Sequence, residues 1–319
     1  MLIKLSIVFG AGFFIYKQTF YTREISVDEL VIQIKTYLLQ SNWIILALIT
    51  MTLINWVLEI LKWKLLVHSI QKISFLAAAK QSLSSHTVSL VTPFKLGEYG
   101  GKVLYFQKSK RKKIWLLNLG GDFTQLVMTL LFGIIGFAYF INTFEVPIHL
   151  HKLRTIAYLL AMLLLIFLGG FKVSSRYPKA NYYTRLVTFI RQQSYKSLGL
   201  LLFLSFLRYL VFSHQFYFLI WVFEIEIAYA TAMMLLFTMY FLARLLPTIY
   251  LFDFVIKGSI AIYLFSFLQI DETSILSIAT IMWLLNFAVP ALLGSYFVLV
   301  SKTDGNIKAK KVKTDLNNI

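Results

Sequence analysis

Cysteine is absent from the 319-residue chain, and histidine and acidic residues are scarce. The lack of cysteine excludes disulfides, thiolate metal sites and cysteine nucleophiles. The five histidines are too scattered to form a zinc motif. Charged residues make up only 14% of the chain, against about 25% in a typical soluble domain. These deficits exclude an ordinary soluble enzyme and a disordered chain, and we expect neither a metal nor a cofactor.

Hydrophobic residues make up 59% of the chain, and the formal net charge is +17. The basic residues stand in short clusters between long apolar runs, which is the pattern of a membrane protein whose positive loops stay in the cytoplasm. A nucleic-acid partner would need a separate folded basic domain, and the sequence has no such region. The composition therefore predicts an all-α polytopic membrane protein that does not bind nucleic acid.

About six apolar runs are predicted to cross the bilayer as helices; the first is short, and the others are long enough, or nearly so, to span about 30 Å of hydrocarbon. These runs are residues 5–16, 43–58, 114–142, 155–171, 197–223 and 273–301. No small-residue cleavage site follows the first run, so we expect it to remain as an uncleaved span. Residues 21–42 are amphipathic and predict a helix at the membrane surface.

Two further apolar stretches, residues 73–106 and 227–270, are interrupted by proline, glycine and charged residues. Each predicts a helix, a break marked by Pro93 or Pro247, and a second helix. Broken backbone is tolerated at membrane depth only where protein or water surrounds it, so we interpret each stretch as a re-entrant hairpin. Two ordinary spans joined by a tight turn are the alternative. For His86, in the first stretch, a structural hydrogen bond is favoured over a proton relay.

The charges also predict the orientation of the chain in the membrane. Basic residues gather in residues 108–113, 172–196 and 302–319, which we expect in the cytoplasm together with both termini. Residues 224–226 and 271–272 hold acids and no basic residue, and residues 143–154 hold Glu145 with Lys152 and Arg154; we expect all three ranges on the opposite side.

The two interrupted stretches indicate an internal repeat. Ile73 and Ile227 each precede a proline by 20 residues, so the offset is 154 residues (227 − 73). Because the charges place the first hairpin on the cytoplasmic side and the second on the other, the two repeats are predicted to be inverted, as in many secondary transporters. The predicted divisions are an N-terminal span with a surface helix (1–42), a first repeat (43–154), a connecting span with a basic loop (155–196), a second repeat (197–301) and a basic tail (302–319).

The first proline break carries the most informative polar residues. Pro93 removes an amide donor, and Gly97 permits a tight turn or a close helix contact. A carboxylate, Glu98, stands there between two ammonium groups, Lys95 and Lys102. Charges inside a membrane are costly, so we predict that they bind substrate. The alternative is that Glu98 pairs with one of the lysines and only holds the hairpin together.

Other intramembrane charges complete the predicted substrate-binding set. Asp122 lies about two turns into its span, where it faces a cavity or pairs with a nearby basic residue. Arg208 lies in the middle of a span and cannot deprotonate, so it needs a lipid phosphate or a carboxylate such as Asp122. Arg244 precedes the second proline break, and Asp253 and Lys257 share a helix face at a spacing of i, i+4.

The segment from Pro93 to Glu98 resembles the transmembrane region of lysylphosphatidylglycerol synthases, a flippase-like family of bacterial membrane proteins. Further motifs that resemble the family are Trp63-Lys64-Leu65-Leu66 and Pro290-Ala291-Leu292-Leu293-Gly294. The resemblance spans roughly residues 40–300 and implies a bacterial inner-membrane protein that handles lipid. The chain departs from the family at Gly101, where a basic residue is frequent, and in the second hairpin, which lacks the glycine-rich Arg-Glu ending. No synthase domain follows, so aminoacyl transfer is not expected.

Two functions follow from these observations. The first is a lipid translocator, in which basic side chains take a lipid phosphate and carboxylates bind a cationic headgroup or carry protons. The second is a membrane-embedded transferase acting on a lipid-linked substrate, with Glu98 or Asp122 as the general base. We expect the translocator, because the sequence lacks the acidic metal cluster and the nucleotide-binding domain that such a transferase uses. The expected partner is a membrane phospholipid or lipid-linked substrate, and a homo-oligomer is compatible with the pattern.

Overall fold

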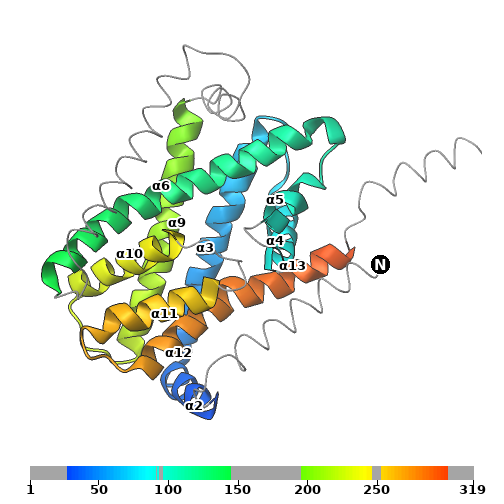
Figure 1. The fold of residues 1–319 in the computed structure, drawn as a ribbon. Helices are drawn as coiled ribbons and strands as arrows, with labels where there is room; N and C mark the ends of the chain where they lie inside the picture. The colour runs from blue at the N-terminus through cyan, green and yellow to red at the C-terminus, as the bar shows by residue number, and fades with distance from the viewer. Residues whose placement is uncertain (1–26, 91, 93–95, 145–194, 246–252, 301–319) are drawn as a thin grey trace, which may run out of the picture.

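The computed structural model describes residues 27–90, 92, 96–144, 195–245 and 253–300, and every regular element among them is helical (Figure 1). The elements are α2 (Val27–Leu38), α3 (Asn42–His68), α4 (Phe75–Leu90), α5 (Leu96–Val103), the 3-10 turn η1 (Lys108–Lys110), α6 (Arg111–Thr143), α9 (Tyr195–Val222), α10 (Tyr229–Leu245), α11 (Asp253–Ser266), α12 (Glu272–Trp283), the π-helical turn η3 (Leu284–Ala288) and α13 (Val289–Val300). The all-α prediction is confirmed for these residues.

Among the described residues, four helical stretches are long and apolar enough to cross a membrane: Asn42–His68, Lys108–Thr143, Tyr195–Val222 and Glu272–Val300. They coincide with four of the six predicted spans. The last of them joins α12, η3 and α13 into one continuous helix. The predicted spans at 5–16 and 155–171 lie outside the described residues, and α2 falls within the predicted amphipathic segment.

Helices α3 and α9 pack against each other in opposite directions. Near the start of α3, the carbonyl of Leu48 accepts a hydrogen bond from Gln215 in the second half of α9. One turn beyond the middle of α3, Glu59 contacts Arg208 at the middle of α9. Contacts therefore advance along α3 as they recede along α9, so the two helices are antiparallel (Figure 1).

Helices α4 and α10 both end just ahead of a predicted break. Helix α4 ends at Leu90 and α10 at Leu245, and proline follows within three residues in each case, at Pro93 and Pro247. Proline disfavours helical backbone in the residue before it and removes a donor from the following turn. A second short helix follows each break, so both stretches contain the two helices that the sequence predicts.

The order of elements is the same in the two halves. A long helix (α3 or α9) is followed by two short helices and then by another long one. Helices α4 and α10 begin at Phe75 and Tyr229, which are 154 residues apart (229 − 75), the offset that the sequence repeat predicts. The first short helix of each half packs on the last long helix of the other, since α4 lies against α13 and α10 against α6.

The contact between α4 and α13 depends on Gly294. A Cβ added to Gly294 would overlap the carbonyl of Leu83 and the hydroxyl of Thr87, both in α4. This close approach allows the Thr87 hydroxyl to donate a hydrogen bond to the carbonyl of Ala291 at 2.7 Å. A small residue thus lets the two helix backbones come together, as is common between helices in membranes.

The two ends of the bundle carry opposite charge. We call the end formed by the C-terminus of α3 and the N-termini of α4, α6 and α9 the basic end, and the other the acidic end. Described residues of the basic end include no carboxylate, and its cations are Lys64, Lys72, Lys80, Lys108, Lys110, Arg111, Lys112, Lys113 and Lys196. The acidic end carries Asp28, Glu29, Glu224, Glu226, Asp271 and Glu272, with Lys35.

Asp271 at the acidic end caps α12. Its carboxylate accepts hydrogen bonds from the backbone N–H and the hydroxyl of Ser274, at 2.8 and 2.9 Å. Partial burial alone would raise the pKa of Asp271, but these hydrogen bonds outweigh it and lower the pKa below its usual value. The cap fixes the start of the last long helix.

We expect Gly294→Ala to lower the free energy of unfolding by about 1–3 kcal/mol, because the added methyl group pushes α13 away from α4. Gly120→Ala, in α6, is the matched control, because a Cβ there meets no atom within 4 Å. Alanine at position 120 should leave stability unchanged or raise it by up to about 1 kcal/mol. Unfolding curves of the two variants in mild detergent make the comparison, and equal curves would contradict the close contact.

Candidate functional site

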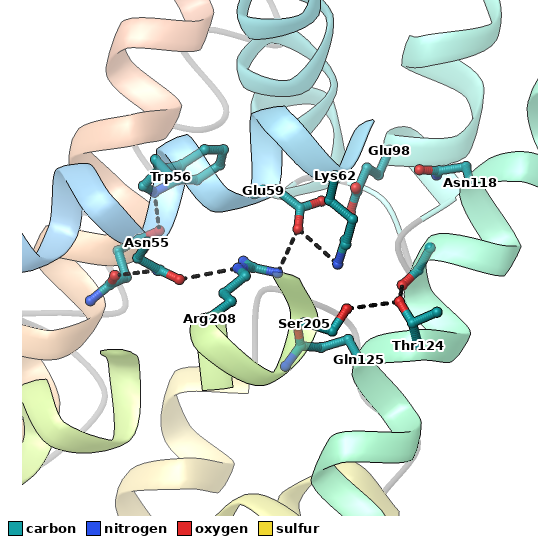
Figure 2. Close-up of polar contacts among 12 residues, drawn as sticks. Asn55, Trp56, Glu59, Lys62, Glu98, Asn118, Thr124, Gln125, Ser205 and Arg208 are labelled. Carbon is teal, nitrogen blue, oxygen red and sulfur yellow. Dashed lines mark hydrogen bonds and ion pairs between the residues drawn. The ribbon is translucent and has the colours of Figure 1, made fainter. Parts of the chain in front are cut away.

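Arg208 and Glu59 form an ion pair where α3 and α9 cross (Figure 2). Nη1 of Arg208, in the middle of α9, donates to Oε2 of Glu59 at 2.7 Å, and Nε donates to Oδ1 of Asn55 at 3.1 Å. The same Glu59 oxygen accepts from Nζ of Lys62 at 3.0 Å. One carboxylate oxygen therefore joins two cations that come from different helices.

The three polar residues of α3 share one helix face. Asn55, Glu59 and Lys62 follow a spacing of i, i+4, i+7, so they lie in a stripe on an otherwise apolar helix. Sequence reasoning ended the apolar run at Leu58 and missed Glu59 and Lys62 as site residues. Their helical spacing within a 27-residue helix is the signal that could have found them.

A second ion pair lies in α5. Nζ of Lys102 donates to Oε1 of Glu98 and to Oδ1 of Asn118, each at 2.8 Å. The same nitrogen lies 4.6 Å from the ring centroid of Trp63, so it also makes a cation–π contact with α3. The indole N–H of Trp63 donates to Gln81 of α4. Lys102 is 1% exposed, and its contacts tie α5 to α3 and α6.

The two ion pairs and Asp122 belong to one electrostatic unit. Lys102 of α5 interacts electrostatically with Glu59 of α3, and Asp122 of α6 interacts electrostatically with Lys62 of α3. We call this unit the charge cluster; it has three cations and three carboxylates and is therefore balanced: Lys62, Lys102, Arg208, Glu59, Glu98 and Asp122. Buried charges need such pairing, because an uncompensated one costs several kcal/mol.

A chain of amide side chains connects the charge cluster to the last long helix. Asn55 donates to Oδ1 of Asn286 at 2.8 Å, and Asn286 donates to Oε1 of Gln215 at 3.0 Å. Gln215 in turn donates to the hydroxyl of Thr52 at 2.8 Å. Asn286 lies in the π-helical turn η3, a type of turn that is frequent at functional sites. The sequence gives no signal for this turn.

Two amides of α6 leave buried polar atoms without a hydrogen-bond partner among the described residues. They are Nδ2 of Asn118 and both polar atoms of the Gln125 side chain. Gln125 follows Thr124, whose hydroxyl pairs with that of Ser205 one turn before Arg208 (Figure 2). Leaving such a group unsatisfied costs about 1–3 kcal/mol, so these amides are suited to bind a molecule that enters the site.

The structure brings together Glu98, Lys102, Asp122 and Arg208 from the predicted site. Asp122 accepts a hydrogen bond from the hydroxyl of Tyr99, and the carboxylate that Arg208 contacts is Glu59. The pairing of Glu98 with Lys102, which the sequence offered as an alternative to binding, is present. It holds α5 in place and also forms part of the charge cluster.

Of the other predicted residues of the first break, Gly97 is described by the structure. Pro93 and Lys95 are outside the described residues. The N–H of Gly97, at the start of α5, donates to the hydroxyl of Thr92 at 2.7 Å. A Cβ on Gly97 would overlap the carbonyl of Val88, so glycine allows α5 to begin directly against α4.

Among the predicted residues of the second half, Arg244 acts electrostatically on Tyr99, the partner of Asp122. Arg244 is exposed at the end of α10. Nζ of Lys257 lies 5.2 Å from the ring centroid of Phe287 and 6.0 Å from that of Tyr240. Asp253 begins α11, but its side chain is outside what the structure describes.

His86 is buried, as a structural histidine would be. Its Nε2 lies 3.4 Å from the carbonyl oxygen of Phe287, and its ring packs edge-on against Trp56. These contacts fit the structural role that the sequence favours.

Comparisons of the chain with protein families, with curated proteins and with solved structures found no match. The resemblance to the transmembrane region of lysylphosphatidylglycerol synthases therefore stays a prediction from short motifs.

We expect Lys102→Met to lower the free energy of unfolding by about 3–5 kcal/mol, because it removes the ammonium group that pairs with the buried carboxylate of Glu98 and donates to Asn118. The double variant Glu98→Gln/Lys102→Met removes both charges and should regain most of that loss. Lys108→Met, at the exposed basic end, is the control and should change stability by less than about 0.5 kcal/mol. Denaturation of the purified variants in detergent measures all three; a double variant as unstable as Lys102→Met would contradict the pairing.

Proposed function

We propose that this protein is a membrane translocator that moves an amphiphile with an anionic headgroup, a phospholipid or a lipid-linked molecule, between the two leaflets. The observation that carries the proposal is the charge cluster at the crossing of two helices long enough to span a bilayer. Ionisable groups at this depth are rare and, as a rule, face a substrate or ion pathway. Arginine and lysine are the side chains that bind phosphate most readily.

The packing of the two halves supports the inverted repeat that the sequence predicts. Helix α4 starts at the basic end, and α5 leads back to it through η1 and α6. Helix α10 starts at the acidic end, and α11 leads back to the turn before α12. With 16 and 17 residues, α4 and α10 are each about 25 Å long, less than the about 30 Å of a bilayer core. Two re-entrant hairpins that enter from opposite sides account for this arrangement.

Inverted halves place the binding site near the midplane of the bilayer. Broken helices that meet there are a common site for substrates in secondary transporters. The antiparallel packing of α3 and α9 supports the same geometry, because equivalent helices of inverted halves cross the membrane in opposite directions. We further propose that the basic end faces the cytoplasm of a bacterial cell, with six spans in all and both termini on that side.

The conformation of the charge cluster corresponds to a closed state. Each cation is held by a carboxylate of the protein, so an incoming headgroup must replace one of these partners. Arg208 is the most accessible member of its group, with a side chain 25% exposed against 11% for Glu59 and 3% for Lys62. Arg208 is therefore the cation that a headgroup meets first.

We expect Arg208→Met to slow lipid translocation at least tenfold, because the headgroup loses its first cation, whereas Arg208→Lys keeps the charge and part of the rate. To measure translocation, the purified protein is placed in phosphatidylglycerol vesicles that carry a fluorescent phosphatidylglycerol. The translocation rate is the rate at which the fluorescent label becomes inaccessible to an external quencher. Lys112→Met, at the exposed basic end, should match the wild type.

A correctly folded Arg208→Met variant with the wild-type rate would contradict the proposal. Mass spectrometry of the vesicle lipids separates the alternative function in the same samples. A modified lipid that accumulates only with active protein would point to a membrane-embedded transferase instead.

A further inference from the structure

We propose that Arg208 and Lys62 form a phosphodiester site that Glu59 occupies in the closed state, and that a lipid headgroup binds there in exchange for Glu59 together with one proton. This inference rests on the proposed function and names the ligand and its coupling. The ligand is a monoanionic phosphodiester of the kind found in phospholipids.

The contacts of Glu59 are those that a phosphate oxygen would make. A single oxygen of Glu59 lies 2.7 Å from Nη1 of Arg208 and 3.0 Å from Nζ of Lys62. A non-bridging phosphate oxygen accepts hydrogen bonds from guanidinium and ammonium groups in the same way. Glu59 therefore acts as an internal substitute for the anion, and it leaves both Arg208 and Lys62 when the anion binds.

The unpaired amides of α6 provide further donors for a phosphodiester. Nδ2 of Asn118 and Nε2 of Gln125 have no acceptor among the described residues, although both atoms are buried. Asn118 is 3% exposed, and its oxygen is already used by Lys102. A phosphodiester has two non-bridging oxygens with several lone pairs, so it can accept from amides that the Glu59 carboxylate leaves unused.

Charge balance couples the anion to a proton. Within the described residues, the three cations and three carboxylates of the charge cluster balance when all are ionised, so an added monoanion would give this set one excess negative charge. Such a charge is expensive in a low-dielectric site. A proton from solvent that converts the displaced carboxylate of Glu59 into a carboxylic acid restores neutrality, and the same proton leaves when the headgroup leaves.

Other ionisable groups near Glu59 come from α4, α5 and α6 in the described part of the chain. Lys102 and Glu98 approach from α5 and Asp122 from α6, and each already has a partner in the closed state. His86 of α4 lies beyond Trp56, against the carbonyl of Phe287. The last long helix brings the neutral Asn286 to the face of α3 that carries Glu59. Arg244 acts electrostatically on Tyr99, the partner of Asp122, but it is exposed at the end of α10 and is not buried with the charge cluster. Lys257 lies near the rings of Tyr240 and Phe287. Glu59 is thus the carboxylate that anion binding separates from its cations.

Isothermal titration of the purified protein with dihexanoyl phosphatidylglycerol tests the coupling without any variant. Titrations in buffers with different ionisation enthalpies count the protons taken up. We expect one proton for each bound lipid and a dissociation constant that rises about tenfold for each unit of increasing pH. Binding without proton uptake would overturn the inference and leave the proposed function standing. A protein that neither binds the lipid nor moves it in vesicles would overturn both.

The variant Glu59→Gln tests whether Glu59 is the group that takes up the proton when the lipid binds. The glutamine is neutral, so this variant should bind the lipid more tightly than the wild type, with no proton uptake and no dependence on pH. Glu272→Gln, exposed at the acidic end, is the matched control and should behave like the wild type. A folded Glu59→Gln variant that still takes up one proton would overturn the role of Glu59.

Dimethyl phosphate, which has the same charge and no acyl chains, identifies the source of the anion. Binding at least tenfold weaker than that of the lipid supports a lipid site. Equal binding of the two compounds would show a site for free phosphodiesters and overturn the lipid assignment.

Discussion

The contact of Glu59 with Arg208 and Lys62 is the interaction on which the centre of the bundle depends. Arg208 lies at the middle of an apolar helix and cannot lose its charge, so the fold must supply a carboxylate at that depth. Glu59 supplies it from a residue 149 positions earlier in the chain. The pair fixes where α3 and α9 cross. Asn55, which accepts a hydrogen bond from Arg208, donates one to Asn286 and so also fixes the position of the last long helix.

The packing around this contact explains why the centre can be polar. One apolar core lies among α6, α9, α10, α11 and α12, and a second lies among α3, α4 and the start of α6. Each half places its first short helix against the last long helix of the other half. Apart from Arg208, whose side chain is 25% exposed, the ion-paired side chains of the charge cluster are largely buried beside these apolar regions, where water screens them little and their ion pairs are strong. A site that binds a headgroup and leaves the acyl chains in the bilayer needs this combination.

Helix positions follow closely from the sequence, because hydropathy, proline and the spacing of a repeat act locally. The starts of α4 and α10 differ by the predicted offset, and both helices end just ahead of a proline. Glu59 and Lys62 were missed, because a charge after an apolar run looks like the end of a span when the partner is unknown. Asp122 was a suggested partner of Arg208, but it contacts Tyr99. Pairings between distant helices, and a π-helical turn that moves Asn286 into the centre, depend on tertiary packing that local patterns do not encode.

The two halves of the chain are proposed to have opposite orientations in the membrane, and side-specific labelling tests this directly. Ser109 lies just before α6, and Glu272 is the first residue of α12, so each marks the start of the last long helix of its half. The chain has no cysteine of its own. Ser109→Cys and Glu272→Cys, made singly, can be exposed in intact cells to a maleimide that does not cross the membrane. Inverted halves predict that Glu272→Cys reacts from outside and Ser109→Cys reacts only after the cells are opened. Labelling of both cysteines from the same side would contradict the inversion.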